Sequence, residues 1–263
     1  MNEYAFILAG FFVGLVVGLT GVGGGSLMTP LLIFGFGIKP HLAIGTDLLF
    51  AAFTKMGGTV SLARSRLVDW RIVGQVAAGS IPASLVTLYV LENVGPANTA
   101  VQSIMTTTLG AALLLTAVAT LYKAVRGKAV PVHIATELLE QATTARHWSL
   151  PVLFGAISGT LVTLTSVGAG AIGVTVLMML YPALPLPRIV AADIAHAVPL
   201  TLVAGLGHAS IGSVDWPLLV KLLAGSLPGI WLGTYLMHKT PDRVIRALLS
   251  VLLAYAGIKL ITI

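Results

Sequence analysis

Ten apolar segments run along this chain, separated by shorter stretches that hold most of its charged residues. The segments lie at 4–20, 26–38, 42–63, 70–91, 98–122, 150–165, 171–184, 189–210, 216–237 and 243–262. An α-helix needs about 20 apolar residues to cross a bilayer, and the first two segments of each half are shorter than that. The apolar runs lack the alternation over about ten residues that marks a transmembrane β-barrel. The pattern therefore predicts an all-α integral membrane protein.

The sequence contains two copies of one pattern. Leu19–Gly25 and Leu164–Gly170 lie 145 residues apart and share five of seven residues. Further matches occur at an offset of 146: Asp47 with Asp193, Val68–Trp70 with Val214–Trp216, and Ala78–Pro82 with Ala224–Pro228. Internal repeats with Gly-interrupted apolar segments point to the substrate site of many transporters. We predict two repeats, 1–122 and 149–263, joined by a linker at 123–148.

Each repeat begins with a re-entrant hairpin or broken helix. The short apolar segments flank a glycine-rich break, which is Gly21–Gly25 in the first repeat and Ser166–Gly170 in the second. Each repeat is then one such hairpin plus three transmembrane helices. Because a hairpin that returns to its starting side adds no crossing, each repeat crosses the membrane an odd number of times. The second repeat is therefore expected to enter the membrane from the opposite side.

The basic residues of the loops support this inversion. Arg64, Arg66 and Arg71 follow the third apolar segment, whereas the equivalent segment 207–217 contains no Lys or Arg. Short loops rich in Lys and Arg stay in the cytoplasm, so the linker 123–148, with four basic residues, is predicted to be cytoplasmic. We therefore expect two inverted-topology repeats in a prokaryotic inner membrane, with both termini on the non-cytoplasmic side.

The composition agrees with a membrane location and argues against several functions. The 263 residues are 57% hydrophobic and 9% charged, with a mean hydropathy of +0.98, whereas a soluble domain has about 25% charged residues. The absence of cysteine rules out disulfides and thiolate metal sites. The histidines lack metal-ligand spacing, and no basic patch interleaved with aromatic residues suggests nucleic-acid binding. We expect no cofactor, no metal and no nucleic-acid partner.

The glycine-rich breaks are the first candidates for substrate binding. Irregular backbone at mid-membrane depth is tolerated where it is buried in protein or lines a cavity, and a helix that starts there directs N–H groups and a positive dipole end toward an anion. The candidate substrate-binding residues at the breaks are Gly23, Gly24, Gly25, Ser26, Gly168, Gly170 and Ala171. The alternative is that the glycines only permit close helix packing. Gly14, in an unbroken segment, is expected to tolerate alanine.

Charged residues inside apolar segments are costly and usually functional. Asp47 and Asp193 are repeat-equivalent, and they either couple transport to protons or hold the hairpins by hydrogen bonds. Lys55 lies two turns beyond Asp47 and needs a counter-charge, which an aspartate or a bound anion would supply. His196 follows Asp193 by three residues and shares its helix face, so it either carries protons or is a hydrogen-bonded packing residue.

Two further aspartates have a simpler explanation. Asp69 and Asp215 each stand directly before a tryptophan at the start of an apolar segment. An aspartate N-cap followed by an interfacial tryptophan accounts for both pairs. We predict that Asp69 and Asp215 cap helices and have no catalytic or binding role.

Several of these motifs resemble the sulfite exporter TauE/SafE family, also called the 4-toluene sulfonate uptake permeases. The matching elements are Gly14–Gly25, Pro30–Leu32, Ala43–Asp47, Val68–Trp70 and Gly79–Pro82. The resemblance covers nearly the whole chain and recurs weakly in the second repeat. It implies transport, often export, of small sulfur-containing anions such as sulfite, sulfoacetate or other organosulfonates. It also points to Gly23, Gly24, Gly25, Thr46 and Asp47 as site residues.

The function that fits these features best is secondary transport of a small sulfur-containing anion, usually outward, by alternating access between the two glycine-rich breaks. A passive anion channel of the same architecture is the alternative. An enzyme is not expected, because the sequence lacks both the G-x-S-G and histidine set of an intramembrane serine protease and a metal-ligand set. The expected partners are the anion and the lipid bilayer, with the protein a monomer or homodimer.

Overall fold

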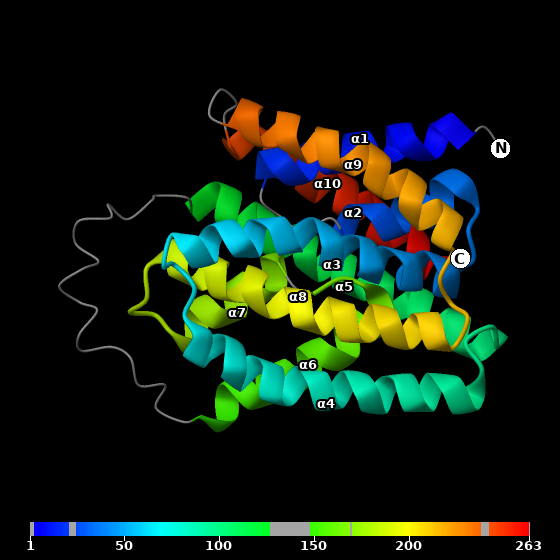
Figure 1. Cartoon of the computed structure of the whole chain (residues 1–263), viewed down its shortest axis with the longest axis horizontal. Helices are drawn as coiled ribbons and strands as arrows, with labels where there is room; N and C mark the ends of the chain where they lie inside the picture. Colours follow the sequence, from blue (N-terminus) through cyan, green and yellow to red (C-terminus); the bar gives the residue numbers. More distant parts are fainter. Residues whose placement is uncertain (1–2, 21–24, 127–147, 169, 238–241, 263) are drawn as a thin grey trace.

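The computed structural model describes residues 3–20, 25–126, 148–168, 170–237 and 242–262, and all regular elements in these ranges are helical. The elements are α1 (Glu3–Thr20), α2 (Gly25–Pro30), the π-helical turn η1 (Leu31–Gly35), α3 (Pro40–Arg64), α4 (Trp70–Val94), α5 (Thr99–Arg126), α6 (Ser149–Thr165), α7 (Ala171–Leu180), α8 (Leu186–Ser210), α9 (Trp216–Met237) and α10 (Asp242–Ile261) (Figure 1). Helices α4, α5, α8 and α9 are long and apolar enough to cross a membrane. The predicted all-α membrane fold is confirmed.

Both predicted hairpins contain a helix break at the expected place. α1 ends at Thr20 and α2 begins at Gly25, while α6 ends at Thr165 and α7 begins at Ala171. α2 is short because Pro30, which lacks a backbone N–H, is followed by the wider π-helical turn η1. Each break is therefore followed by a half-helix, α2 or α7, as the short apolar segments predict.

The two predicted N-caps are confirmed. Asp69 Oδ1 accepts hydrogen bonds from the backbone N–H groups of Arg71 and Ile72, at 3.1 and 3.4 Å. Asp215 Oδ1 accepts one from the N–H of Leu218 at 3.0 Å. These side chains satisfy donors at the starts of α4 and α9 that have no partner within the helix.

Each long helix of the first repeat packs mainly against a helix of the second. α1 packs along α9, and its repeat-equivalent α6 packs along α4, which is the equivalent of α9. The other two pairs join equivalent helices directly: α3 packs against α8, and α5 against α10. The contacts of Leu49 with Gly205, and of Gly45 with His208 and Ser213, mean that the equivalent helices α3 and α8 run antiparallel. These contacts agree with the inverted repeat, which stays a prediction.

Glycines allow the closest of these helix contacts. Gly10, Gly14 and Gly18 of α1 approach the backbone of α9, and Gly225, Gly229 and Gly233 of α9 approach that of α1. A Cβ at Gly14 would lie 2.7 Å from the Cα of Ser226, closer than packed atoms can come. The expectation that Gly14 tolerates alanine is therefore wrong, because small residues at this spacing set the distance between two membrane helices.

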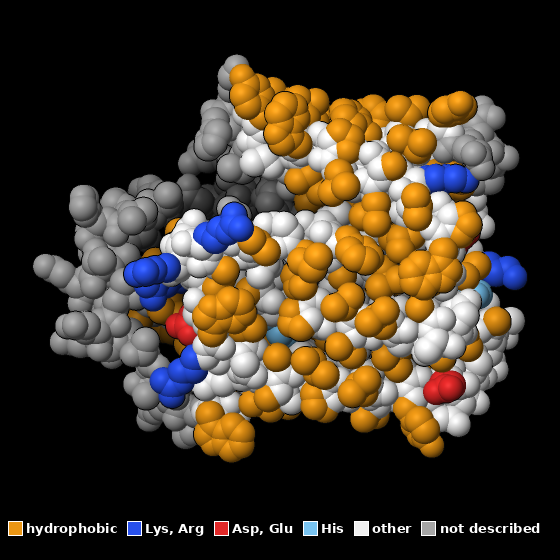
Figure 2. Space-filling model, viewed as in Figure 1, with side chains coloured by type: hydrophobic (Ala, Val, Ile, Leu, Met, Phe, Trp, Pro, Cys, Tyr) orange, Lys and Arg blue, Asp and Glu red, His pale blue; other side chains and the backbone are white. Residues whose placement is uncertain are grey.

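The two ends of the bundle hold different segments. α1 begins and α10 ends at what we name the terminal end, and α5 ends and α6 begins at the opposite, linker end (Figure 1). α3 ends at the linker end, whereas α8 ends at the terminal end. Hydrophobic side chains cover the middle of the face shown in Figure 2, and Lys and Arg side chains lie toward its ends. Most of the predicted linker, 127–147, lies outside the described residues, and which end faces the cytoplasm stays a prediction.

Candidate anion and ion site

The central helices α3 and α8 bring together the charged residues that the sequence analysis selected. Asp47 on α3 and Asp193 on α8 are 0% and 3% exposed, so neither carboxylate is in contact with solvent. Lys55 is half-buried and interacts electrostatically with both aspartates. The negative charges of the two repeat-equivalent carboxylates thus favour the charged form of this lysine within the bundle.

Asp47 connects the half-helix that follows the first break to the second break. The hydroxyl of Thr29, on the half-helix α2, donates a hydrogen bond to Asp47 Oδ2. Ser166, the residue directly after α6, also lies next to the Asp47 carboxylate. Ser166 has a left-handed backbone with φ of 60°, and its N–H donates to the carbonyl of Val162 at 2.7 Å. One carboxylate of the first repeat therefore contacts the half-helix of its own repeat and the break of the other.

Apolar packing also brings the two hairpins into contact. Leu27 of α2 and Phe34 of η1 pack against a buried cluster that includes Val167, in the break after α6. Leu161 of α6 and Val16 of α1 pack against the same cluster. The two hairpins, more than a hundred residues apart in the sequence, therefore meet in one region of the bundle.

Asp193 lies against the first turn of the other half-helix, α7. A Cβ at Gly173 would lie 2.9 Å from the Cγ of Asp193, so only glycine leaves room for the carboxylate here. Each buried aspartate thus contacts the half-helix of its own repeat, Asp47 through Thr29 and Asp193 at Gly173. This agrees with the structural alternative, in which the aspartates hold the hairpins, and it leaves a second role in ion coupling open.

His196 lies one turn along α8 from Asp193 and is 3% exposed. Its Nε2 forms a hydrogen bond of 2.8 Å with the hydroxyl of Ser80 on α4, and it lies within electrostatic range of Lys55. The histidine is therefore part of the same polar group as Lys55 and Asp193. Its hydrogen bond with Ser80 is the packing contact that the sequence analysis gave as the alternative role.

The break before α7 has a backbone that suits glycine alone. Gly168 and Gly170 have φ values of 136° and 132°, a region that side-chain-bearing residues rarely adopt. The N–H of Gly173 is bonded to the carbonyl of Gly168 at 3.2 Å. The N–H groups of Ala171 and Ile172 come earlier in the first turn of α7, which is where a helix start offers backbone donors to an anion.

The first break is described only in part. Gly23 and Gly24 lie outside the described residues. Gly25 begins α2, and Ser26 is buried in its first turn. Thr46, also a candidate for substrate binding, is buried, and its hydroxyl accepts a hydrogen bond of 3.0 Å from the N–H of Asp215. That contact ties Thr46 to the turn before α9 rather than to the charged residues.

Several residues of this region escaped the sequence analysis. Thr29 and Gly173 have no distinctive local motif, and Ser80 stands in the repeated element Ala78–Pro82 without any role assigned to it. They become important because folding places Thr29, Gly173 and Ser80 against Asp47, Asp193 and His196, respectively. The internal repeat did offer one signal, since Thr175 stands at the position equivalent to Thr29.

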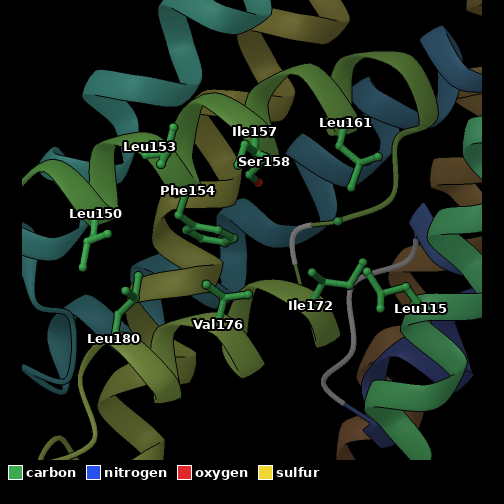
Figure 3. A pocket seen from close by; sticks show the side chains of 11 residues that line it. Leu115, Leu150, Leu153, Phe154, Ile157, Ser158, Leu161, Ile172, Val176 and Leu180 are labelled. Carbon is green, nitrogen blue, oxygen red and sulfur yellow. The ribbon is translucent and has the colours of Figure 1, made fainter.

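A groove next to the second break has a different character. It has a volume of about 380 Å³ and lies between α6 and α7, beside Leu115 of α5 (Figure 3). Its lining is apolar apart from Ser158, and it reaches Gly168 at the break. An apolar wall offers nothing to an anion, so the anion site is to be sought on the charged side of α7, toward Asp193.

Comparisons with known proteins agree with the motif resemblance. A family model described as sulfite exporter TauE/SafE matches residues 6–260. The probable membrane transporter protein YjnA of Bacillus subtilis is 35% identical, over 98% of this chain and 99% of its own length. The probable membrane transporter protein MJ0441 of Methanocaldococcus jannaschii is 24% identical, over 96% and 92%. No solved structure matches the chain. On the extent of these matches, the chain belongs to the sulfite exporter TauE/SafE family.

Proposed function

We propose that this protein is a secondary transporter that exports a small sulfur-containing anion, such as sulfite or an organosulfonate. The observation that carries the proposal is the meeting of the half-helix α2 and the second break at Asp47, with Lys55 in range of both buried carboxylates. The anion class comes from the family, and the names of the relatives support transport in general. We place the protein in a prokaryotic inner membrane, as a monomer or homodimer with external termini.

The anion is proposed to bind between the two breaks. On one side are the first turn of α2, with Ser26, and the glycines before it. On the other are Gly168, Gly170 and the N–H groups of Ala171 and Ile172 at the start of α7. A sulfite or sulfonate group has three acceptor oxygens, which suit several backbone donors. The Lys55 ammonium supplies a charge-assisted contact, which is stronger than one between neutral groups.

The charges of the site favour protonation of a carboxylate while the anion is bound. Two ionised carboxylates and one ammonium, from Asp47, Asp193 and Lys55, leave a net charge of minus one. A monovalent anion would raise this to minus two inside a low-dielectric bundle, which is strongly unfavourable. We propose protons as coupling ions, bound within the set formed by Asp47, Asp193 and His196.

The contacts of the two carboxylates would couple their protonation to movement of the half-helices. Asp47 accepts a hydrogen bond from Thr29 on α2, and Asp193 abuts Gly173 on α7. A change of charge on either aspartate therefore alters the attachment of a half-helix next to the proposed anion. Alternating access would use the glycine-rich breaks as hinges, so that the site opens to one membrane side at a time.

Solute flux tests this function. Purified protein is reconstituted into liposomes, and uptake of radiolabelled sulfite is measured with and without a pH gradient. We expect saturable uptake that responds to the gradient, and sulfoacetate should compete with sulfite while sulfate and taurine serve as comparison solutes. Uptake that rises linearly with concentration and ignores the pH gradient would instead indicate the passive channel.

A further inference from the structure

The central helices α3 and α8 differ in how closely their equivalent faces are packed. On α8, Thr201, Ala204 and His208 share one face of the helix and are 1%, 0% and 0% exposed. At the repeat offset of 146, the equivalent residues of α3 are Lys55, Gly58 and Leu62. Gly58 is exposed, and the other two are half-buried. One of two equivalent faces is therefore closed, and the other is open.

We propose that the open face of α3 is the path by which the anion reaches its site from the linker end. Lys55 lies at the inner end of this face, within electrostatic range of the buried Asp47 and Asp193. A lysine beside two buried carboxylates is accessible only if an opening leads to it. Gly58 lies one turn further toward the linker end, and a Cβ there would meet no atom within 4 Å. The opening therefore continues along α3 from Lys55 toward the linker end.

The residue types on this face indicate water rather than lipid. The Lys55 ammonium and the hydroxyl of Thr59 lie on it, and lipid tails offer neither group a hydrogen-bond partner. Thr59 Oγ1 has no partner among the described residues, and a water molecule in the path would supply one. The other side of the helix, with Phe53, Met56 and Val60, is apolar and 44%, 48% and 46% exposed. That side suits contact with lipid, so the polar face is the aqueous one.

The equivalent face of α8 is closed by packing at the terminal end. Ala204 belongs to a buried cluster whose other members come from several helices. Those from α4, α5 and α6 are Leu91, Met105 and Val162. His208 Nε2 donates a hydrogen bond of 2.9 Å to the carbonyl of Thr163 on α6. Within the part of the chain that the structure describes, this conformation is therefore open along α3 and closed along α8.

The path deepens the proposed function and rests on it. Because the linker end is the predicted cytoplasmic side, this conformation would take up the anion from the cytoplasm, as export requires. The internal repeat also predicts the second conformation. The helices that close over α8 are α4, α5 and α6, and their equivalents α9, α10 and α1 lie on one side of α3 (Figure 1). Movement of these three helices onto α3 would close the linker end, while α4, α5 and α6 open the terminal end.

Cysteine accessibility tests the path, because the chain contains no cysteine. Gly58→Cys and Ala204→Cys are a matched pair, since the two residues are small and repeat-equivalent. Thr201→Cys is a second buried variant, in which the side chain keeps its size. Val118→Cys on α5 is the control for lipid contact, because Val118 is 66% exposed on an apolar helix. Each variant, with Ser65→Cys as the marker of the linker end, is treated with a small, negatively charged maleimide in right-side-out and in inside-out vesicles.

We expect Gly58→Cys to react from the same side as Ser65→Cys, and about tenfold or more faster than the buried and lipid-facing variants, whose thiols water does not reach. Reaction of Gly58→Cys no faster than that of Val118→Cys, or only from the side opposite to Ser65→Cys, would overturn the path. Equal reaction of Gly58→Cys with both Ala204→Cys and Thr201→Cys would overturn it too. Labelling needs no anion, so the expected labelling without any sulfite uptake into liposomes would contradict the proposed anion and leave the path.

Discussion

At the scale of single residues, Lys55 is the group that decides whether the buried charges serve an anion. Lysine interacts with both Asp47 and Asp193, so it has counter-charges even without substrate. If it also contacts the anion, Lys55→Met should weaken sulfite binding about 10- to 100-fold, as expected for the loss of a charge-assisted contact. Isothermal titration of the purified variant measures this.

The matched control for that experiment is Lys221→Met, because Lys221 lies near the start of α9 rather than beside the carboxylates. Both variants should remain folded by circular dichroism. Unchanged sulfite affinity in Lys55→Met would show that the lysine only balances the aspartates.

Substitution of Gly173 tests whether transport depends on the contact between Asp193 and α7. Gly173→Ala would place a Cβ 2.9 Å from the Cγ of Asp193, so either the carboxylate or the start of α7 must move. We expect transport to be lost with a clear fall in melting temperature. Gly74→Ala is the control, because a Cβ there has open space around it and alanine favours the helix. Normal transport by Gly173→Ala would mean that the contact of Asp193 with α7 has no functional weight.

At the scale of helices, the glycine-lined contact of α1 with α9 determines how closely the two repeats approach. Gly14→Ala inserts a methyl group 2.7 Å from the Cα of Ser226, where backbone rather than a flexible side chain must give way. We expect a loss of about 1–3 kcal/mol in stability, as for other overpacked contacts. Gly74→Ala on α4, where a Cβ meets nothing, should be neutral or slightly stabilising. Thermal unfolding in detergent compares the two, and equal melting temperatures would contradict the account.

The helices could largely be predicted from the sequence, because each is a long apolar run that ends at polar or glycine-rich residues. The break after Thr20 and the break after Thr165 were found because both interrupt apolar runs at equivalent positions. The role of Gly14 could not be found in this way. A glycine within a helix appears the same in the sequence whether it faces lipid or another backbone, and only the packing of α1 on α9 distinguishes them.

For the candidate site too, the sequence alone does not identify the residues that come together through packing. The internal repeat selects Asp47 and Asp193, because a carboxylate duplicated inside apolar segments is unusual. Their partners Thr29, Ser166 and Gly173 depend on how the two hairpins meet, which is a property of tertiary packing and leaves no periodic pattern in the sequence.

At the scale of the whole molecule, the arrangement of the ends makes a testable topology. α3 ends at the linker end and α8 at the terminal end (Figure 1), so Ser65 and Ser210 should lie on opposite sides of the membrane. The chain contains no cysteine, so Ser65→Cys and Ser210→Cys can each be labelled alone with an impermeant maleimide in intact cells. Only Ser210→Cys should react, and labelling of both from outside would contradict the inverted repeat.

The most direct test of the central claim is the position of a bound anion. Crystals of the protein soaked with selenite, a heavier analogue of sulfite, would reveal selenium by anomalous scattering. We predict one strong peak between the first turn of α2, at Ser26, and the start of α7, at Gly170 and Ala171, with Lys55 in contact. A peak at the linker end or on the lipid-facing surface, far from both breaks, would contradict this placement.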